Sequence, residues 1–179
     1  MLKIKSDVFF FLFLIFYFLF LVSCLGRMSP VIFDFDDKIA KSRFGLIILS
    51  LENKDKRTLL SMFSKNALEK SNLIDENIDY LFNFFQGDVI SWKLDIGPQV
   101  STKYNYGNKE KIMSSFFSIN TSDQKYLVYV VDYIEDTACS ENIGLFTLRL
   151  IKEEDKETQF TSWQDMKIPG VYNPEVSNN

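Results

Sequence analysis

Gly87 separates two stretches of the chain in which apolar residues recur with different periods. In the stretch before it, five apolar residues fall on one face of an α-helix: Ile74, Ile78, Leu81, Phe82 and Phe85. In the stretch after it, four apolar residues alternate with mostly polar ones, as in a strand with one buried face: Ile90, Trp92, Leu94 and Ile96. This change of period predicts helices first and strands afterwards, which is an α+β fold.

Other segments extend the same pattern. Helical spacing also predicts a helix over residues 36–51 and a second one that follows Asp55, a suitable N-cap. Further strands are expected at residues 111–120, 125–135 and 143–151, and Gly97-Pro98 is expected to end the first strand before a long loop over residues 99–109. We therefore expect N-terminal helices packed on one face of a curved antiparallel sheet of four or more strands.

The strand at residues 125–135 is apolar on both faces, which is typical of a central strand. Helices can cover only one of these faces. The other must be buried by the tail, by a partner or by a ligand. Trp163 and the expected turn at Pro169 to Tyr172 are the tail residues suited to cover it.

The N-terminus has the order of a secretory signal peptide. Lys3 and Lys5 precede fifteen apolar residues, 8–22, and a small residue, Ser23, comes next. The ending Leu21-Val22-Ser23-Cys24 resembles a bacterial lipobox, in which the cysteine receives a diacylglycerol and becomes the first mature residue. This implies cleavage between Ser23 and Cys24 and lipidation of Cys24.

An uncleaved signal anchor is the alternative for this apolar run, although a membrane span needs about 20 apolar residues. Either interpretation places the rest of the chain outside the cytoplasm, on the outer face of the cell membrane. We expect a lipoprotein signal peptide at residues 1–23, a tether at residues 24–35 and one domain at residues 36–175. The expected membrane contact is the lipid on Cys24.

Composition excludes several classes of function. Without residues 1–23, the chain of 179 residues keeps 156 and carries a net charge of −5, which makes it a poor ligand for nucleic acid. It contains no histidine, which excludes Ser-His-Asp and Cys-His catalysis, and its two cysteines cannot supply an ordinary zinc site. If Cys24 carries lipid, Cys139 has no partner for a disulfide within the chain. We expect no metal and no cofactor.

Three segments carry a resemblance to known proteins. Residues 50–64 resemble the helix–break–helix opening of nuclear-transport-factor-2-like domains, and residues 81–89 and 168–172 match in order and spacing. Together with Cys24 they resemble a family of small lipoproteins of unknown function from low-GC Gram-positive bacteria, whose domains adopt this cone-shaped fold. The resemblance implies a fold and a location, and it carries no catalytic residues.

Candidate ligand-binding residues come from the strands. Asp132 is an acid within an otherwise apolar strand, and the aromatic residues can line a pocket or pack in the core: Trp92, Phe117, Tyr129, Tyr133 and Phe146. Tyr104 and Tyr106 lie in a polar segment and are candidates for partner contacts. We expect a non-enzymatic binding module for a protein or an envelope component. The alternatives are a carrier or sensor of a small apolar ligand, and an isomerase- or cyclase-like enzyme that uses Asp132 with a tyrosine.

Overall fold

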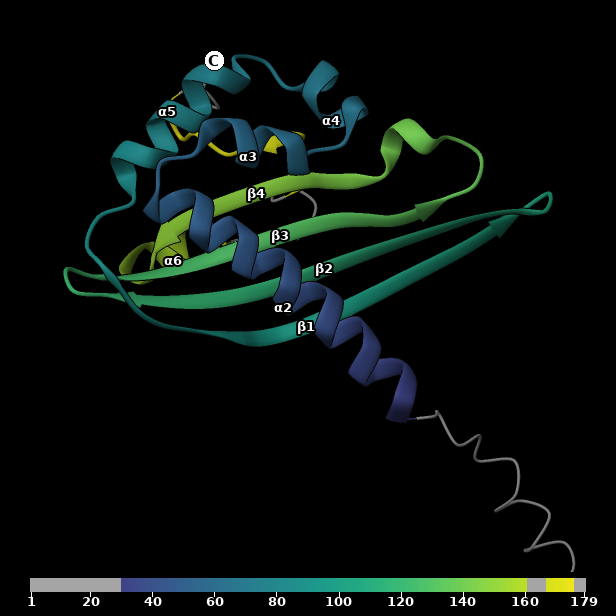
Figure 1. Ribbon diagram of the computed structural model, residues 1–179, viewed down its shortest axis with the longest axis horizontal. Helices are drawn as coiled ribbons and strands as arrows, with labels where there is room; N and C mark the ends of the chain where they lie inside the picture. Colours follow the sequence, from purple (N-terminus) through teal and green to yellow (C-terminus); the bar gives the residue numbers. More distant parts are fainter. Residues whose placement is uncertain (1–29, 161–166, 176–179) are drawn as a thin grey trace, which may run out of the picture. The chain divides into compact units, whose positions relative to one another are not determined.

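The computed structural model describes residues 30–160 and 167–175 (Figure 1). The chain divides into two units, Met1–Phe35 and Asp36–Asn179. The predicted signal peptide, Ser23 and Cys24 lie outside the described residues. A helix begins at Pro30, so it starts within the segment predicted as a tether. Among the described residues, no helix has both the length and the apolar character needed to cross a membrane.

Four helices come first. They are α2 (Pro30–Glu52), α3 (Lys56–Met62), α4 (Lys65–Lys70) and α5 (Ile74–Phe84). Asp55 caps α3 as predicted, because its carboxylate accepts a hydrogen bond from the backbone N–H of Thr58 at 3.0 Å. No helix was expected from the sequence at residues 65–70, where α4 lies. That prediction was wrong, since Ser64 caps this short helix by accepting from the N–H of Ala67 at 3.1 Å.

The strands form one five-stranded sheet in the order β1-β2-β3-β4-β5. Its members are β1 (Val89–Asn105), β2 (Asn108–Thr121), β3 (Lys125–Asp136), β4 (Gly144–Lys152) and β5 (Gly170–Val171). The first four strands are antiparallel to their neighbours, and β5 is parallel to β4. A short helix, α6 (Lys156–Gln159), follows β4. The described residues thus confirm an α+β fold with five α-helices and a mixed, mostly antiparallel, open sheet.

Strand β1 is longer than predicted. It does not end at Gly97-Pro98, and residues 99–105, predicted as loop, continue to pair with β2. The pairing is irregular between Ile96 and Gln99, so the proline lies in a bulge. Proline is tolerated there because β1 is an edge strand, where a missing N–H removes no hydrogen bond within the sheet. The predicted loop is therefore half of a long hairpin.

Tyr106 and Gly107 form the two-residue turn of this hairpin. Both have positive φ angles, 47° and 84°, as a type I′ turn requires. Glycine adopts this conformation freely, whereas a tyrosine at such an angle is uncommon. The flanking residues Asn105 and Asn108 pair directly across the turn.

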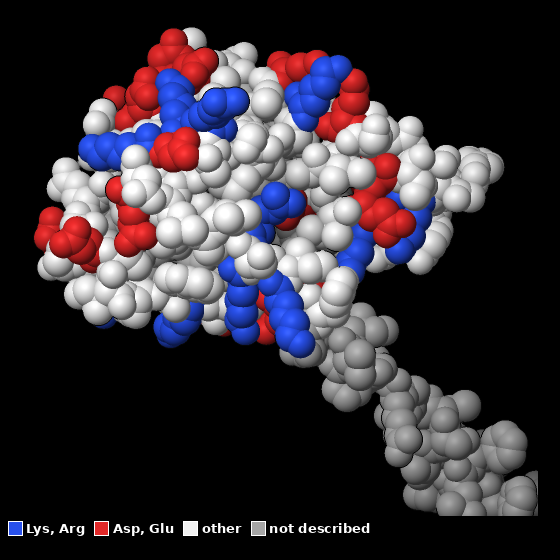
Figure 2. Space-filling view, in the orientation of Figure 1, with Lys and Arg blue, Asp and Glu red and all other residues white. Residues whose placement is uncertain are grey.

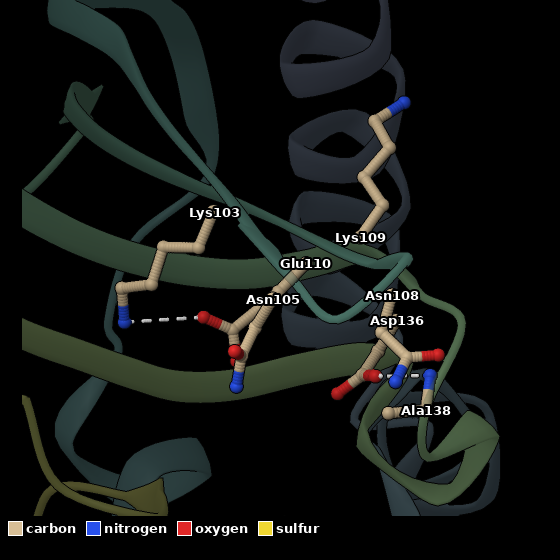
Figure 3. A pocket seen from close by; sticks show the side chains of 7 residues that line it. All are labelled: Lys103, Asn105, Asn108, Lys109, Glu110, Asp136 and Ala138. Carbon is tan, nitrogen blue, oxygen red and sulfur yellow. Dashed lines mark hydrogen bonds and ion pairs between the residues drawn. The ribbon is translucent and has the colours of Figure 1, made fainter.

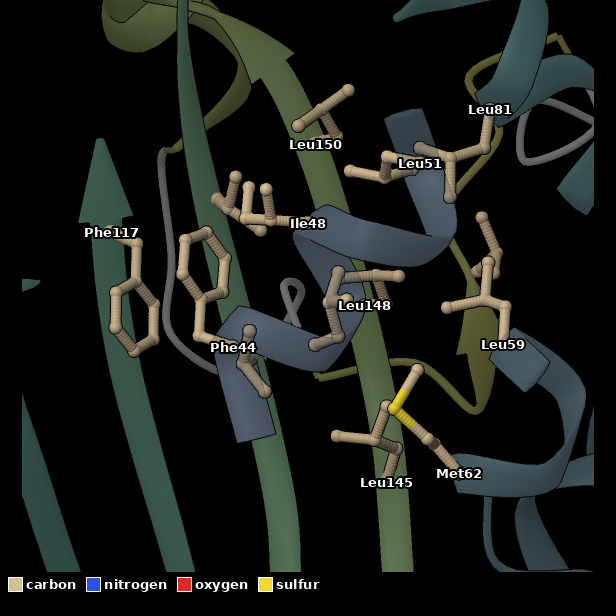
Figure 4. Packing of buried hydrophobic residues seen from close by; sticks show 14 of the residues in the cluster. Phe44, Ile48, Leu51, Leu59, Met62, Leu81, Phe117, Leu145, Leu148 and Leu150 are labelled. Carbon is tan, nitrogen blue, oxygen red and sulfur yellow. The ribbon is translucent and has the colours of Figure 1, made fainter. Parts of the chain in front are cut away.

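The main hydrophobic core lies between the helices and one face of the sheet (Figure 4). Phe44 of α2 is fully buried and stacks on Phe117 of β2, with ring centroids 3.8 Å apart. The predicted inner face of α5 is also buried, including Ile78 and Leu81. Figure 4 shows Met62 of α3 pointing toward Leu145 of β4, which closes the core at that end.

The C-terminal segment at residues 168–172 was predicted as a turn. In the structure it instead adds β5 beside β4, and the N–H of Tyr172 donates to the carbonyl of Leu148 at 2.9 Å. Val171 is buried in the main core. Asn173 then donates to Asn77 of α5 at 3.1 Å, and both residues are buried. The tail is therefore part of the domain.

Candidate functional site

The six predicted ligand-binding residues do not meet at one place. Trp92 and Phe117 lie on the helix-covered face, where Trp92 contacts Phe44 edge-on with ring centroids 5.2 Å apart. These rings pack against each other in the main core. They pack in the core, which was one of the two uses expected for the aromatic residues.

Tyr129, Tyr133 and Phe146 lie in a second cluster on the opposite face of the sheet. The Tyr133 and Phe146 ring centroids are 5.6 Å apart. Tyr129 is 4.7 Å from the ring of Phe116, a neighbour on β2. Burial raises the pKa of both tyrosine hydroxyls, so they stay protonated at neutral pH.

The tail covers part of this second face. Phe160 packs edge-on against Phe116 at 5.4 Å, and the Nζ of Lys167 lies 5.2 Å from the centre of the Tyr133 ring. Arg149 is held in the same region, because it donates to the carbonyl of Gln159 at 2.6 Å. Trp163, the other predicted tail contact, lies outside the described residues. The tail thus takes some of the space that an apolar ligand would need.

Asp132 remains as the chemically unusual candidate. It is 2 % exposed, on the helix-covered side of β3, and its Oδ2 accepts a hydrogen bond from the Nε of Arg43 at 2.9 Å. Its Oδ1 is buried and has no hydrogen-bond partner among the described residues. The β3–β4 pairing shifts at this point, so that Asp132 faces Leu145. One half of the carboxylate is therefore satisfied and the other half is not.

The environment of Asp132 favours its neutral form. Burial raises the pKa of this carboxyl group, and the charge and hydrogen bond of Arg43 offset only part of that rise. A buried acceptor without a partner costs free energy. An N–H or O–H group supplied by a ligand would remove that cost. The site is thus suited to bind a hydrogen-bond donor.

Arg43 connects this buried carboxylate with the surface. Its side chain is 29 % exposed and lines a shallow groove of about 380 Å³ along α2. The other lining residues all belong to the same helix: Lys38, Ile39, Ser42 and Leu46. Figure 2 shows basic and acidic side chains next to a hollow near the centre of the surface that it draws. We call the pair and this groove the Asp132–Arg43 site.

A second buried ion pair lies toward the start of α2. The Nζ of Lys111 on β2 lies 2.5 Å from Oδ1 of Asp36, and the two side chains are mostly buried. This pair attaches the first residue of the domain to β2, five positions after Tyr106 of the hairpin turn. Asp36 belongs to an acidic cluster in the sequence, and here its charge is balanced by a lysine.

A polar pocket of about 290 Å³ lies beside the tip of the hairpin (Figure 3). Figure 3 shows Lys103 reaching toward Glu110, and their charged atoms are 3.2 Å apart. Asp136, also in its wall, accepts from the side chain of Asn142 and from two backbone N–H groups, and these bonds lower its pKa. The charged groups of this pocket are thus already paired within the chain. No cluster of metal-ligating side chains occurs in the part of the chain that the structure describes.

The sequence identified Asp132 and missed Arg43. The signal for Arg43 was present but weak, since it lies beside Phe44, on the border of the apolar face of a helix. Its partner is 89 positions away, a distance over which helical or strand periodicity carries no information. The structure alone brings the two charges together.

These features define a small α+β domain with one partly satisfied buried charge pair. Residues 46–153 match the model of a protein family described as a domain of unknown function, DUF5104. The chain belongs to this family. The match includes Asp132 and the β1–β2 hairpin, and it begins three residues after Arg43. A comparison with curated proteins found no match.

Proposed function

We propose that this protein is a lipid-anchored, extracytoplasmic binding module with a nuclear-transport-factor-2-like cone and without catalytic activity. The anchor is supported by the basic N-terminus, the apolar residues 8–22 and the lipobox-like Leu21 to Cys24. The cone is supported by the order of the elements, with helices first and then a mostly antiparallel sheet that α2 crosses (Figure 1). The observation that carries the binding role is the unpartnered Oδ1 of Asp132.

The chemistry of the site indicates what kind of group it binds. Oδ1 of Asp132 accepts a hydrogen bond, and the guanidinium of Arg43 donates one, so a group with a donor beside an acceptor fits both. Hydroxyl, amide and carbamoyl groups of a protein or an envelope component have this arrangement. A purely apolar ligand, our alternative from the sequence, would leave Oδ1 of Asp132 without a hydrogen bond.

An isomerase- or cyclase-like enzyme is less well supported. General acid–base catalysis needs two titratable groups within hydrogen-bond reach of one substrate. The two tyrosines nearest to Asp132 on its own strand, Tyr129 and Tyr133, lie in the cluster on the other face of the sheet. The chain offers no histidine to replace them.

Lipidation is tested at Cys24. We expect intact-mass analysis of the membrane-bound protein to show a mature chain that begins at Cys24 and carries a diacylglycerol. Cys24→Ser should abolish this mass and leave the precursor unprocessed, and globomycin should have the same effect on processing of the unaltered protein. Cys139→Ser is the matched control and should be lipidated normally. An unmodified Cys24 in the membrane-bound form would contradict the anchor and favour an uncleaved signal anchor.

Binding at the Asp132–Arg43 site is tested by native mass spectrometry of the protein purified from its own host. We expect a small-molecule adduct or a stoichiometric complex that disappears in Asp132→Leu. Asp123→Leu, which removes an exposed acid from the β2–β3 turn, should retain it. An adduct of equal abundance in Asp132→Leu, or the absence of any adduct or complex, would contradict binding at this site.

A further inference from the structure

We infer that the tip of the β1–β2 hairpin, residues 104–108, rests on the lipid surface to which the chain is anchored. This inference depends on the proposed lipid anchor and assigns a second membrane contact to the domain. The tip contains two tyrosines, two asparagines and a glycine, and no charged residue. Tyr104 is 75 % exposed and Tyr106 is 99 % exposed.

The tip is built in an unusual way. Tyr106 has a positive φ angle of 47°, at a turn position where asparagine or glycine is the ordinary residue. A bulky side chain at such an angle is strained, and full exposure to water gives it no packing in return. Tyrosine does gain at a membrane–water interface, where its ring enters the apolar layer and its hydroxyl stays hydrated. An interface contact therefore accounts for a residue that the fold itself does not require.

The length of the chain places the tip within reach of the membrane. Asp36, twelve residues after Cys24, is bound to Lys111 of β2. Residues 30–36 are helical and residues 24–29 are not described, so a lipid on Cys24 can lie at most ~30 Å from Asp36. The hairpin extends four residues from Lys111 to Gly107, or ~13 Å along the strand. The undescribed and helical residues between Cys24 and Asp36 are thus long enough for an anchored chain to bring the tip to the lipid surface.

Charge supports contact with the interface rather than with anionic headgroups alone. The lysines beside the tip are paired, Lys103 with Glu110 at 3.2 Å and Lys109 with Glu135 at 2.6 Å. Paired charges beside the tip neither attract nor repel an anionic surface strongly. We therefore expect the contact to form on zwitterionic lipid and to change little with salt.

The test uses the mature chain with a hexahistidine tag in place of residues 1–24, bound to phosphatidylcholine vesicles that contain a nickel-chelating lipid. Cys139→Ser is made throughout, and an environment-sensitive NBD dye is attached either to Asn105→Cys at the tip or to Asp123→Cys. Residue 123 lies in the turn at the other end of β2, so the two labels report on opposite ends of one strand. The vesicles carry a lipid with a nitroxide quencher at a shallow position in the acyl chain.

We expect the dye at residue 105 to shift its emission to the blue and to be quenched, while the dye at residue 123 shows neither effect. Adding Tyr104→Thr and Tyr106→Asn should reduce the signal at residue 105 to that at residue 123, with circular dichroism unchanged. Asparagine suits the turn and threonine suits the strand, so this variant keeps the hairpin.

Two results would overturn the inference. One is the absence of quenching at residue 105 on vesicles that hold the protein, which would leave the tip available to a protein partner. The other is quenching that persists in the double tyrosine variant. Because the nickel lipid replaces the diacylglycerol, neither result depends on whether Cys24 is lipidated in the cell, which intact-mass analysis decides separately.

Discussion

Phe44→Ala is expected to destabilise the domain by about 3–5 kcal/mol, the usual cost of truncating a buried phenylalanine. Phe44 is fully buried, stacks on Phe117 and contacts Trp92 edge-on, so alanine would leave a cavity where three rings now meet. A domain of this size is held together by about 5–15 kcal/mol. We therefore expect the midpoint of thermal unfolding to fall by roughly 10–15 °C.

Leu49→Ala is the matched control for this variant. Leu49 lies on the same helix with its side chain 55 % exposed, and the substitution removes apolar atoms that are mostly in contact with water. We expect an effect within about 0.5 kcal/mol. Equal losses for the two variants, measured by urea denaturation of the mature domain, would show that α2 does not pack through the face described above.

Arg43→Ala should have the second large effect, and its size should depend on pH. Without Arg43, the carboxylate of Asp132 is a buried charge with no partner, which typically costs about 3–5 kcal/mol. Burial already raises the pKa of Asp132 above its ordinary value of 3.8, and loss of the guanidinium raises it further. The penalty should therefore be largest at neutral pH, where the unfolded chain ionises this group freely.

The direction of the pH dependence follows from proton binding. The folded state binds the Asp132 proton more tightly than the unfolded state, so its stabilising contribution is complete below pH 3.8 and is lost as the pH rises through the raised pKa. Acidification from pH 7 toward pH 4 should thus shrink the difference between Arg43→Ala and the unaltered protein. The double variant Arg43→Ala/Asp132→Leu should recover most of the stability at pH 7. A penalty that is the same at pH 7 and pH 4 would mean that the lost interaction is not with a titrating Asp132.

The energetic cost of this pair is an argument for the binding role that we propose for it. Replacing a partly satisfied buried charge pair by well-packed apolar residues is often neutral or stabilising. A domain that keeps Asp132 between Val131 and Tyr133 therefore gains little stability from it. The binding role that we propose gives the carboxylate a reason to be there, and the same argument applies to Tyr106 at the hairpin tip.

Much of the fold could be predicted from the sequence because helices and strands depend on neighbouring residues. The change of apolar period at Gly87 placed α5 and the start of β1 correctly, and Asp55 marked the start of α3. Gly87 itself has a φ angle of 83°, a left-handed conformation that glycine adopts freely. Each of these signals lies within one helix or strand or at its end, so it can be recognised without the rest of the chain.

The end of β1 could not be predicted in the same way. Gly97-Pro98 usually stops a strand, and here it does not, because the strand is at the edge of the sheet and a bulge absorbs the irregularity. Whether a strand is at the edge or in the centre is decided by its neighbours in space. The sequence around Gly97 does not indicate the order of the strands in the sheet.

The candidate site, too, could be predicted from the sequence only in part. Asp132 stood out in the sequence as an acid in an apolar strand. Asp132, Tyr129 and Tyr133 were all expected to line one pocket. Strand alternation by itself puts Asp132 on the face opposite the two tyrosines, so that expectation was wrong. Tertiary structure decided the rest. Folding brought Arg43 to Asp132 across 89 positions and placed Phe160 and Lys167 of the tail on the second aromatic cluster. Local sequence determines which face of a helix or strand a side chain occupies, whereas only the packing of distant segments determines what that side chain meets.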